Sequence, residues 1–422
     1  MKITLINTSD AGGGAPAACM RLLQALGSPG VDAQLLVQHK KTNGERVEGI
    51  ANNFITRLKA NFNRLYERIP FILFHEKDKS VRFAFSTANA GTSIINEQLV
   101  TDADILHLHW TNSGFLSIND IKELVATGKP IVWTLHDMWA FTGGCHYSGT
   151  CNNFMDECGN CPFLRDADEN DISHNGWVRK AMLYAAAENI TFVTCSKWLA
   201  GVAKQSSLIK DLRIEAIPNP IDVAVFSPQD KTAARNKRGI DPTAKIILFG
   251  AANINDKRKG LTYLVDALNI LKNDYPQTVY IEVVIFGKNK HFDVSQLPFP
   301  VHELNLITSQ QELAEIYSLA DVFVTTALED NLPNTVMEAL ACGTPVVAFN
   351  TGGIPEMVDH QQNGYLAEFK SAPDLAKGLY EVLYTYSTAQ LAANARQKVL
   401  DNYTNERVAK QYTDLYRSVI KK

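Results

Sequence analysis

Two carboxylates separated by seven residues form the first candidate site of this chain. Asp330 lies in a loop behind the strand-like run Asp321–Ala327, and Glu338 lies inside the predicted helix Asn334–Ala341. Each carboxylate can accept hydrogen bonds from two neighbouring hydroxyls, as a sugar or ribose ring presents them. The residues between them belong to the same candidate site: Asn331, Leu332, Pro333 and Asn334, of which Asn334 alternatively caps the helix.

A basic segment precedes the first helix of the second half of the chain. Arg258 and Lys259 stand next to Gly260, and the helix predicted over Leu261–Leu271 begins directly afterwards. Cations beside the backbone N–H groups of a helix start are typical of a phosphate site. The alternative interpretation is a solvated basic loop.

A run of three glycines follows the first predicted strand. Gly12, Gly13 and Gly14 precede a predicted helix, so the backbone can approach a ligand closely and the helix start favours an anion. A plain flexible turn is the alternative. The run lacks the G-x-G-x-x-G spacing, and the second strand, Ala33–Gln38, has no acidic residue at its end. Both observations argue against an enzyme that uses a nicotinamide cofactor.

The pair His136-Asp137 comes directly after the predicted strand Ile131–Leu135. Polar residues at the carboxyl end of a parallel strand lie where such sheets bind ligands, so we favour a functional role for His136 over a capping pair. His107 and His109 alternate with apolar residues instead, and we interpret them as core residues.

Four cysteines lie within one short segment with the spacing C-x5-C-x6-C-x2-C: Cys145, Cys151, Cys158 and Cys161. Four thiolates can hold a structural zinc ion, and C-x2-C is a common half-site. Disulfides, which a reducing compartment disfavours, and buried unpaired thiols are the alternatives.

Short β-branched runs alternate with helical patterns in both halves of the chain, which predicts two α/β domains with doubly wound parallel sheets. The turn-rich segment Ile217–Asp222 is the predicted linker. We expect a first Rossmann-like domain over residues 1–217 and a second over 222–403, facing across a cleft. The amphipathic C-terminal helix, about residues 404–422, is expected to pack back on the first domain.

Composition excludes some classes of protein. The net charge of −4 argues against a nucleic-acid binder, and no apolar run is long enough to span a bilayer. We therefore expect a cytoplasmic protein, at the inner face of the membrane if it contacts one. The segment Phe54–Phe85 mixes aromatic and basic residues. It is either an amphipathic helix on an anionic membrane or, as we favour, a helix docked on the sheet.

The acidic segment resembles the signature of the family-4 glycosyltransferases, in which two glutamates are separated by seven residues and a Gly-Thr-Pro-Val-Val run follows. The resemblance covers essentially the whole chain through ordered motifs: Gly12–Gly14, His136, Pro218-Asn219 with Asp222, Lys259-Gly260, and Thr351-Gly352-Gly353 with Glu356. Cysteine clusters after a His-Asp pair are similar to those of some polysaccharide-building members.

The resemblance implies a GT-B fold and an enzyme that retains the anomeric configuration of the sugar it moves. Glu338 would bind the ribose of the donor, Asp330 and His136 the transferred sugar, and Lys259 the diphosphate. The donor would be a UDP- or GDP-sugar, bound mainly by the second domain with Gly12–Gly14 as the donor-side glycine loop. The acceptor would be a saccharide or a polyprenyl-linked saccharide. The resemblance implies no cofactor for catalysis.

Two positions depart from the family pattern. The first glutamate is replaced by Asp330, one methylene shorter, and the arginine that often precedes the Lys-Gly pair is replaced by Asn253. Arg258 is the substitute we expect. We interpret the chain as a hexosyltransferase-type enzyme of cell-surface polysaccharide biosynthesis. The alternatives are a sugar-nucleotide epimerase of the same fold and a sugar-nucleotide-binding protein without catalysis.

Overall fold

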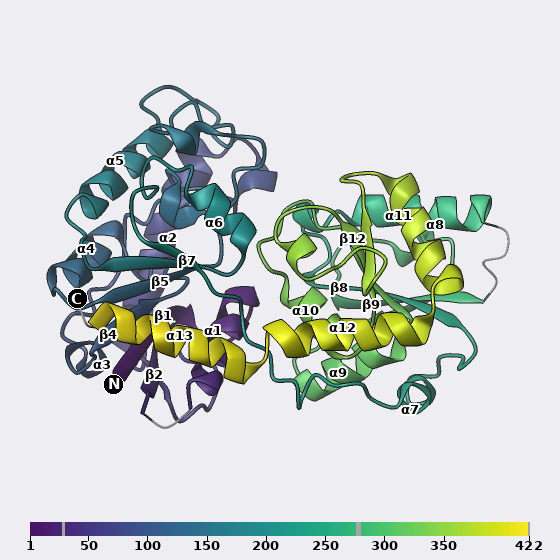
Figure 1. The fold of residues 1–422 in the computed structure, drawn as a ribbon. Coiled ribbons are helices and arrows are strands. Elements are labelled where there is room, and N and C mark those ends of the chain that lie inside the picture. Colours follow the sequence, from purple (N-terminus) through teal and green to yellow (C-terminus); the bar gives the residue numbers. More distant parts are fainter. Residues whose placement is uncertain (28–29, 276–279, 421–422) are drawn as a thin grey trace. The chain divides into compact units, whose positions relative to one another are not determined.

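The computed structural model describes residues 1–27, 30–275 and 280–420. The chain forms two compact units (Figure 1). Unit 1 comprises Met1–Pro220 with Glu406–Lys422, and unit 2 comprises Ile221–Asn405. The C-terminal segment therefore returns to the unit in which the chain begins.

Unit 1 is built on a parallel seven-stranded sheet with the order β3-β2-β1-β4-β5-β6-β7. The order reverses at β1, which is the arrangement of a Rossmann-like sheet. The strands are β1 (Lys2–Ser9), β2 (Asp32–His39), β3 (Val47–Gly49), β4 (Ile105–Leu108), β5 (Ile131–Leu135), β6 (Ile190–Thr194) and β7 (Ile214–Ala216).

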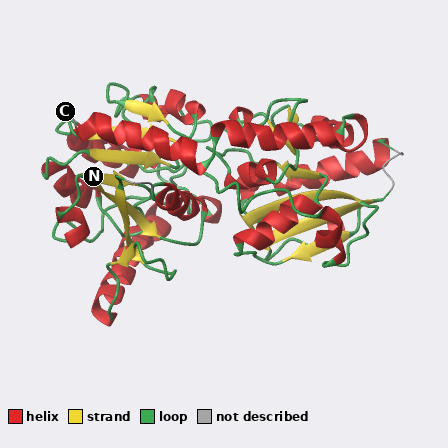
Figure 2. Ribbon diagram, turned by 60° about the horizontal axis from the view of Figure 1, so that its bottom comes forward, coloured by secondary structure: helices red, strands yellow, loops and turns green. Residues whose placement is uncertain are grey.

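The helices of unit 1 are α1 (Gly14–Ala25), α2 (Phe54–Pro70), η1 (Phe71–His75), η2 (Lys79–Val81), α3 (Gln98–Thr101), α4 (Ile118–Ala126), η3 (Trp139–Phe141), η4 (Asn153–Met155), α5 (Ile172–Tyr184), α6 (Lys197–Ala203) and α13 (Asn405–Ile420). Helices lie on both sides of the strands in each unit (Figure 2). The sheet is therefore buried on both faces, which explains why β5 and β6 consist entirely of buried residues.

Unit 2 repeats the scheme with a parallel six-stranded sheet of order β10-β9-β8-β11-β12-β13. Its strands are β8 (Lys245–Asn253), β9 (Ile281–Lys288), β10 (Val301–Leu304), β11 (Val322–Thr325), β12 (Val346–Phe349) and β13 (Gly364–Ala367). Its helices are α7 (Lys231–Asn236), η5 (Lys257–Lys259), α8 (Leu261–Asp274), η6 (Val294–Gln296), α9 (Gln310–Leu319), α10 (Asn334–Ala341), η7 (Ile354–Glu356), α11 (Ala372–Tyr380), η8 (Glu381–Thr385) and α12 (Thr388–Asn402).

Helix α13 packs on unit 1 through one apolar face (Figure 1, yellow). Val408, Leu415 and Val419 join the core formed by α1 and one face of the sheet. The hydroxyl of Tyr416 lies 2.7 Å from Nδ1 of His107 on β4. Apolar burial and a polar contact thus both fix this helix on the unit.

Helix α2 is docked on unit 1 through a narrow stripe of small and polar residues. Its buried side chains are Ala60, Asn63 and Glu67. The Nδ2 group of Asn63 donates to the Gly91 carbonyl at 2.7 Å, and Glu67 accepts the N–H of Gly114. Docking by this stripe leaves seven large apolar side chains of α2 exposed: Phe54, Ile55, Leu58, Phe62, Leu65, Tyr66 and Ile69. Leu73, Phe74 and Phe83, which follow α2, are exposed as well, whereas Phe71 and Phe85 are buried.

In the described part of the chain, no helix combines the length and apolar composition that crossing a membrane requires.

Candidate functional site

In unit 2, the loop after β8 and the loop after β11 bring Lys259 and Asp330 together. Strands β8 and β11 are hydrogen-bonded neighbours in the sheet, so the loops that follow them lie side by side. The Nζ atom of Lys259 lies 2.7 Å from Oδ2 of Asp330. The Lys259 carbonyl also accepts a hydrogen bond from the hydroxyl of Thr326 at 2.7 Å. The cation and the carboxylate predicted from separate motifs thus form one ion pair at the carboxyl edge of the sheet.

Two glycines allow these loops to touch. Gly260 has φ of +64°, and a Cβ atom there would lie 2.1 Å from the carbonyl oxygen of Thr326. Gly352 has φ of +58°, and its Cβ atom would lie 2.0 Å from the carbonyl oxygen of Asp330. Any other side chain would collide with backbone at both positions. The backbone of Asp330 is held in addition by the N–H of Gly353 at 3.1 Å.

Glu338 is buried in α10, with 6% of its surface exposed. The hydroxyl of Tyr317, a fully buried residue of α9, donates to Oε2 of Glu338 at 2.8 Å. A hydrogen bond to a buried carboxylate sets the direction of its oxygens and offsets part of the desolvation cost. Tyr317 thus orients the carboxylate that the family resemblance assigns to the ribose of the donor.

The other predicted site residues of unit 2 differ in their burial and in their contacts. Asn331, Leu332 and Pro333 are buried. Asn334 is the first residue of α10 and Pro333 occupies the cap position, so the capping role considered for Asn334 is wrong. The guanidinium of Arg258 lies 2.8 Å from Asp256 on the exposed side of η5.

A cavity of about 560 Å³ lies beside the same loop, but its lining includes none of Lys259, Asp330 and Glu338. It is formed by η5, the start of α8 and residues 291–296. The candidate site in unit 2 is therefore defined by the contact between Lys259 and Asp330 and by the burial of Glu338, and it does not coincide with this cavity.

In unit 1, the glycine run joins β1 to α1 and is exposed. Gly12 has φ of +96° and Gly13 of +147°, and Gly13 is the N-cap of α1 without a capping side chain. Asp10 holds the loop: its carboxylate accepts the N–H of Lys41 at 2.7 Å and the hydroxyl of Thr42 at 2.6 Å. Burial opposes ionisation, but these hydrogen bonds prevail and lower the pKa of Asp10.

His136 lies at the carboxyl end of β5 as predicted, in contact with two other groups. Its Nε2 atom lies 3.0 Å from Nδ1 of His109, and its Nδ1 atom lies 3.6 Å from the Cys195 sulfur. Burial lowers the pKa of His136 to about 4. The imidazole is neutral near pH 7, so it offers one donor and one acceptor rather than a charge.

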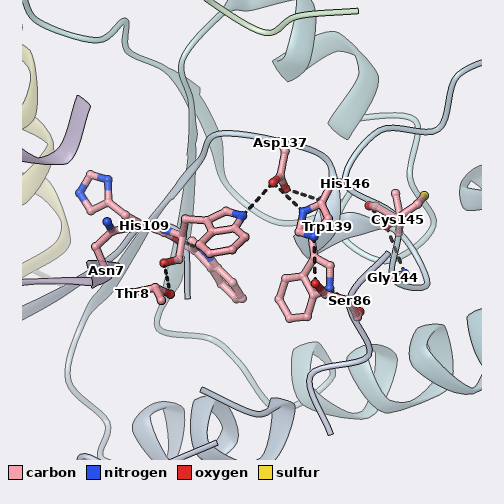
Figure 3. A network of polar contacts seen from close by, with 12 residues as sticks. Asn7, Thr8, Ser86, His109, Asp137, Trp139, Gly144, Cys145 and His146 are labelled. Carbon is pink, nitrogen blue, oxygen red and sulfur yellow. Dashed lines mark hydrogen bonds and ion pairs between the residues drawn. The ribbon is translucent and has the colours of Figure 1, made fainter. Parts of the chain in front are cut away.

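Asp137 has a structural role. Its carboxylate accepts the N–H of Trp139 at 2.9 Å, which starts η3, and the indole N–H of Trp110 at 3.1 Å. It also lies 2.7 Å from Nδ1 of His146 (Figure 3). Burial opposes ionisation, but the contact with His146 prevails and lowers the pKa of Asp137. The capping interpretation thus describes Asp137, whereas His136 points towards His109.

The four cysteines of residues 145–161 all line one cavity of about 20 Å³. Burial raises the pKa of the Cys158 thiol to about 11 and that of Cys161 to about 12, and the neighbouring cysteines add to both rises. All seven cysteines of the chain are free thiols. Among the described residues, no three His, Cys, Asp or Glu side chains are already arranged to hold a metal ion.

Sequence reasoning did not select Tyr317, Asp10 or His146 as site residues. Tyr317 stands at helical spacing among core residues of α9, so its partner is visible only in three dimensions. Asp10 directly follows β1. Its strand-end position is the signal that could have found it.

The family of the chain follows from two matches. The family described as "Glycosyltransferase Family 4" matches residues 12–225, and the family described as "Glycosyl transferases group 1" matches residues 230–398. The chain is a two-domain glycosyltransferase. It belongs to glycosyltransferase family 4, which confirms the resemblance noted in the sequence.

Relatives carry several names. A "Putative colanic acid biosynthesis glycosyl transferase WcaC" of Escherichia coli is 25% identical and aligns with 96% of this chain and 99% of its own. An "N-acetyl-alpha-D-glucosaminyl L-malate synthase" of Bacillus anthracis is 22% identical over 94% of this chain and 95% of its own. A "D-inositol 3-phosphate glycosyltransferase" of Pseudarthrobacter chlorophenolicus is 28% identical over 67% of this chain, and the alignment spans 62% of that protein.

Solved structures confirm the fold. A sucrose-phosphate synthase of Thermosynechococcus elongatus superimposes with a TM-score of 0.68 at 19% identity, covering 99% of this chain and 98% of that one. Anabaena Alr3699/HepE in complex with UDP-glucose superimposes with a TM-score of 0.62 at 15% identity, covering 99% of this chain and all (100%) of the other. Two doubly wound α/β units define the GT-B class to which these enzymes belong.

Proposed function

We propose that this glycosyltransferase transfers a sugar, with retention of configuration, from a UDP- or GDP-sugar to a saccharide or lipid-linked saccharide. The observation that supports this donor class is the Lys259–Asp330 ion pair in the same unit as the buried carboxylate of Glu338. Together they offer a cation for a diphosphate and two carboxylates for ring hydroxyls.

The ion pair suggests how the donor enters. A diphosphate carries more negative charge than Asp330, so it takes over the ammonium of Lys259 when it binds. Asp330 then loses its partner and accepts hydrogen bonds from the hydroxyls of the sugar. Charge that develops on the leaving diphosphate is stabilised by Lys259, which is electrostatic catalysis by a group already in place.

Retention requires that the new bond form on the face of the sugar that the diphosphate leaves. The bond between the anomeric carbon and the phosphate oxygen breaks, and the acceptor oxygen forms the glycosidic bond. The acceptor proton passes to the departing phosphate, so the step needs no carboxylate base. His136, neutral near pH 7, is the group that we assign to a hydroxyl of the transferred sugar.

The exposed surface of helix α2 in unit 1 supports a lipid-linked acceptor. Helix α2 exposes its aromatic side chains, with Phe54 at 80% and Phe62 at 63% exposed. The single acidic residue of Phe54–Pro70, Glu67, is buried, whereas Arg57 and Arg64 are exposed. An apolar and basic surface without exposed acids complements an anionic membrane. We propose that α2 brings the enzyme to a membrane that contains a lipid-linked acceptor.

A role in cell-surface polysaccharide synthesis is supported by the relative named for colanic acid biosynthesis, which aligns over nearly the full length of both chains. Two structural neighbours, Anabaena Alr3699/HepE and the pneumococcal O-GlcNAc transferase GtfA, were solved with UDP, which makes a UDP-sugar the first donor to test.

The donor assignment is tested by thermal unfolding with UDP, GDP and their sugar conjugates. A bound donor raises the melting temperature in proportion to the logarithm of its excess over Kd. We expect a shift with one nucleotide series that Lys259→Ala and Glu338→Ala abolish. Lys257→Ala, in the same 3-10 helix but outside the ion pair, is the matched control and should keep the shift.

Two results would contradict the proposal. Folded protein whose melting temperature responds to no nucleotide would remove the donor site. The second result is an isomerised sugar nucleotide that forms without any acceptor. Product analysis by mass spectrometry would detect it, and it would identify the protein as an epimerase.

A further inference from the structure

The loop between η3 and α5 contains a cluster of chemistry that the sugar site does not use. Four cysteines from this loop line one small cavity: Cys145, Cys151, Cys158 and Cys161. The volume of about 20 Å³ is the size of a single water molecule or ion rather than of an organic ligand.

The walls of this cavity are largely aromatic, and Cys161 is buried in them while the other three cysteines are partly buried. Phe85, Phe154 and Phe163 line it together with Pro162. Phe85 and Cys161 also belong to a small apolar cluster that contains Phe71 and Leu164. The four sulfur atoms are the groups in this lining that bind a soft metal cation most strongly.

The backbone of the C-x2-C half-site is shaped for metal ligation. Cys158, Gly159 and Asn160 have φ of +56°, +89° and +47°. Left-handed conformations at the non-glycine residues Cys158 and Asn160, on either side of Gly159, are costly, and such strain persists where the surroundings or a ligand enforce it. The N–H of Gly143 donates to the Cys158 sulfur at 3.2 Å. Hydrogen bonds of this kind orient thiolates around metal ions.

We propose that the four cysteines bind one structural Zn²⁺ ion. Tetrahedral sulfur coordination is the preference of zinc, with Zn–S distances of about 2.3 Å. The described residues contain no three His, Cys, Asp or Glu side chains already set around an ion. Zinc binding therefore requires the four sulfur atoms to come closer together than they are in this structure.

The ion would act on the enzyme through its neighbours in the chain. His146 follows Cys145 and lies 2.7 Å from Asp137 and 2.9 Å from the hydroxyl of Ser86 (Figure 3). Asp137 in turn follows His136, the residue that we assign to the sugar. Zinc thus positions the loop beside the sugar-binding histidine and takes no part in the reaction.

The test is the metal content of the full-length protein, purified under reducing conditions without chelator and measured by mass spectrometry of the elements. We expect about one zinc ion per chain. Cys151→Ala should lower this to less than about a tenth, and Cys151→His, which restores a zinc ligand, should recover it. Cys342→Ser, a buried cysteine of unit 2 outside this cavity, should keep full zinc content.

A second measurement guards against variants that fail to fold. A mercurial reagent added to the unaltered protein should release the zinc, followed with a chromophoric chelator, and lower the melting temperature. Wild-type protein that contains no zinc and takes none up from a zinc-buffered solution would overturn the proposal. Iron with visible absorbance, or disulfides among these cysteines in peptide mapping, would overturn it as well.

Discussion

The ammonium group of Lys259 lies 2.7 Å from the carboxylate of Asp330, although the two residues are 71 positions apart in the chain. One residue is expected to meet the diphosphate of the donor and the other its sugar. Because the two residues are in contact, a donor has to break their ion pair when it binds. Binding of the diphosphate by Lys259 is therefore coupled to binding of the sugar by Asp330.

The first prediction concerns that link. Asp330→Asn removes the charge that holds Lys259, so UDP or GDP without a sugar should bind more tightly than to the unaltered enzyme, by about threefold to tenfold. Turnover should fall by about 10²-fold because a hydrogen-bond partner of the sugar is weakened. Calorimetry gives the first quantity and product formation the second.

Asp330→Glu is the informative companion variant, because it restores the residue type that the family pattern has at this position. It should bind nucleotide like the unaltered enzyme. If Asp330→Asn binds nucleotide no better than wild type, the donor does not displace the carboxylate from Lys259.

The second prediction concerns the buried histidines of unit 1. Burial lowers the pKa of His107 to about 3 and that of His136 to about 4, from an ordinary value of 6.5. Between these values the unfolded chain binds protons that the folded chain does not. Stability should therefore be complete above about pH 6.5 and decrease as the pH falls towards 4 and then 3.

Urea unfolding at a series of pH values measures this dependence. Replacing one of the histidines, as in His107→Gln, should reduce the slope by up to about 1.4 kcal/mol per pH unit below pH 6. Glutamine keeps the possibility of hydrogen bonds to Thr134 and Tyr416. An unchanged slope would show that His107 is not the group that takes up the proton on unfolding.

The third prediction tests how much stability depends on the close contact between Gly260 and the carbonyl of Thr326 in unit 2. Gly260 and Gly239 have nearly the same conformation, with φ of +64° and +66°, but only a Cβ atom at Gly260 would meet another atom within 4 Å. Gly239→Ala should cost about 1 kcal/mol from backbone strain alone. Gly260→Ala should cost at least about 3 kcal/mol, because it also displaces Thr326 from Lys259.

Differential scanning calorimetry compares the two variants, and each kcal/mol lowers the melting temperature by about 2–4 °C in units of this size. Equal decreases would mean that the loops separate at little cost, and the Lys259–Asp330 contact would then not depend on Gly260.

The fourth prediction concerns α2. Replacing Phe54 and Phe62 by serine should weaken binding to vesicles rich in phosphatidylglycerol by about tenfold or more, since each exposed phenyl ring loses its burial in the interface. Raising the salt concentration should weaken binding further, because Arg57 and Arg64 contribute by charge. Vesicle co-sedimentation measures both effects.

Tyr280→Ser is the matched control, because Tyr280 is 74% exposed but belongs to unit 2. It should leave vesicle binding unchanged. Equal binding of the double variant and the unaltered protein would assign the apolar face of α2 to another partner.

Much of this architecture was predictable from local patterns. The runs that became β5 and β6 are mostly apolar and carry no charge, because a parallel sheet buries both faces. His136 and Asp330 follow strands, and ligands of such sheets bind at the carboxyl ends of strands. The direction of α2 was not predictable in this way. Its aromatic residues suggested an inward face, but Asn63 and Glu67 take that place through hydrogen bonds to backbone in distant loops.

The sequence by itself determined the types of residue at the strand ends, the two α/β halves and the family, since these depend on spacing along the chain. Only the tertiary structure decided which of those residues meet. Lys259 with Asp330, Tyr317 with Glu338, and His107 with Tyr416 are separated by 71, 21 and 309 positions. Such contacts depend on sheet order, on register and on the direction of each side chain. These arise when the elements pack, and no local pattern contains them.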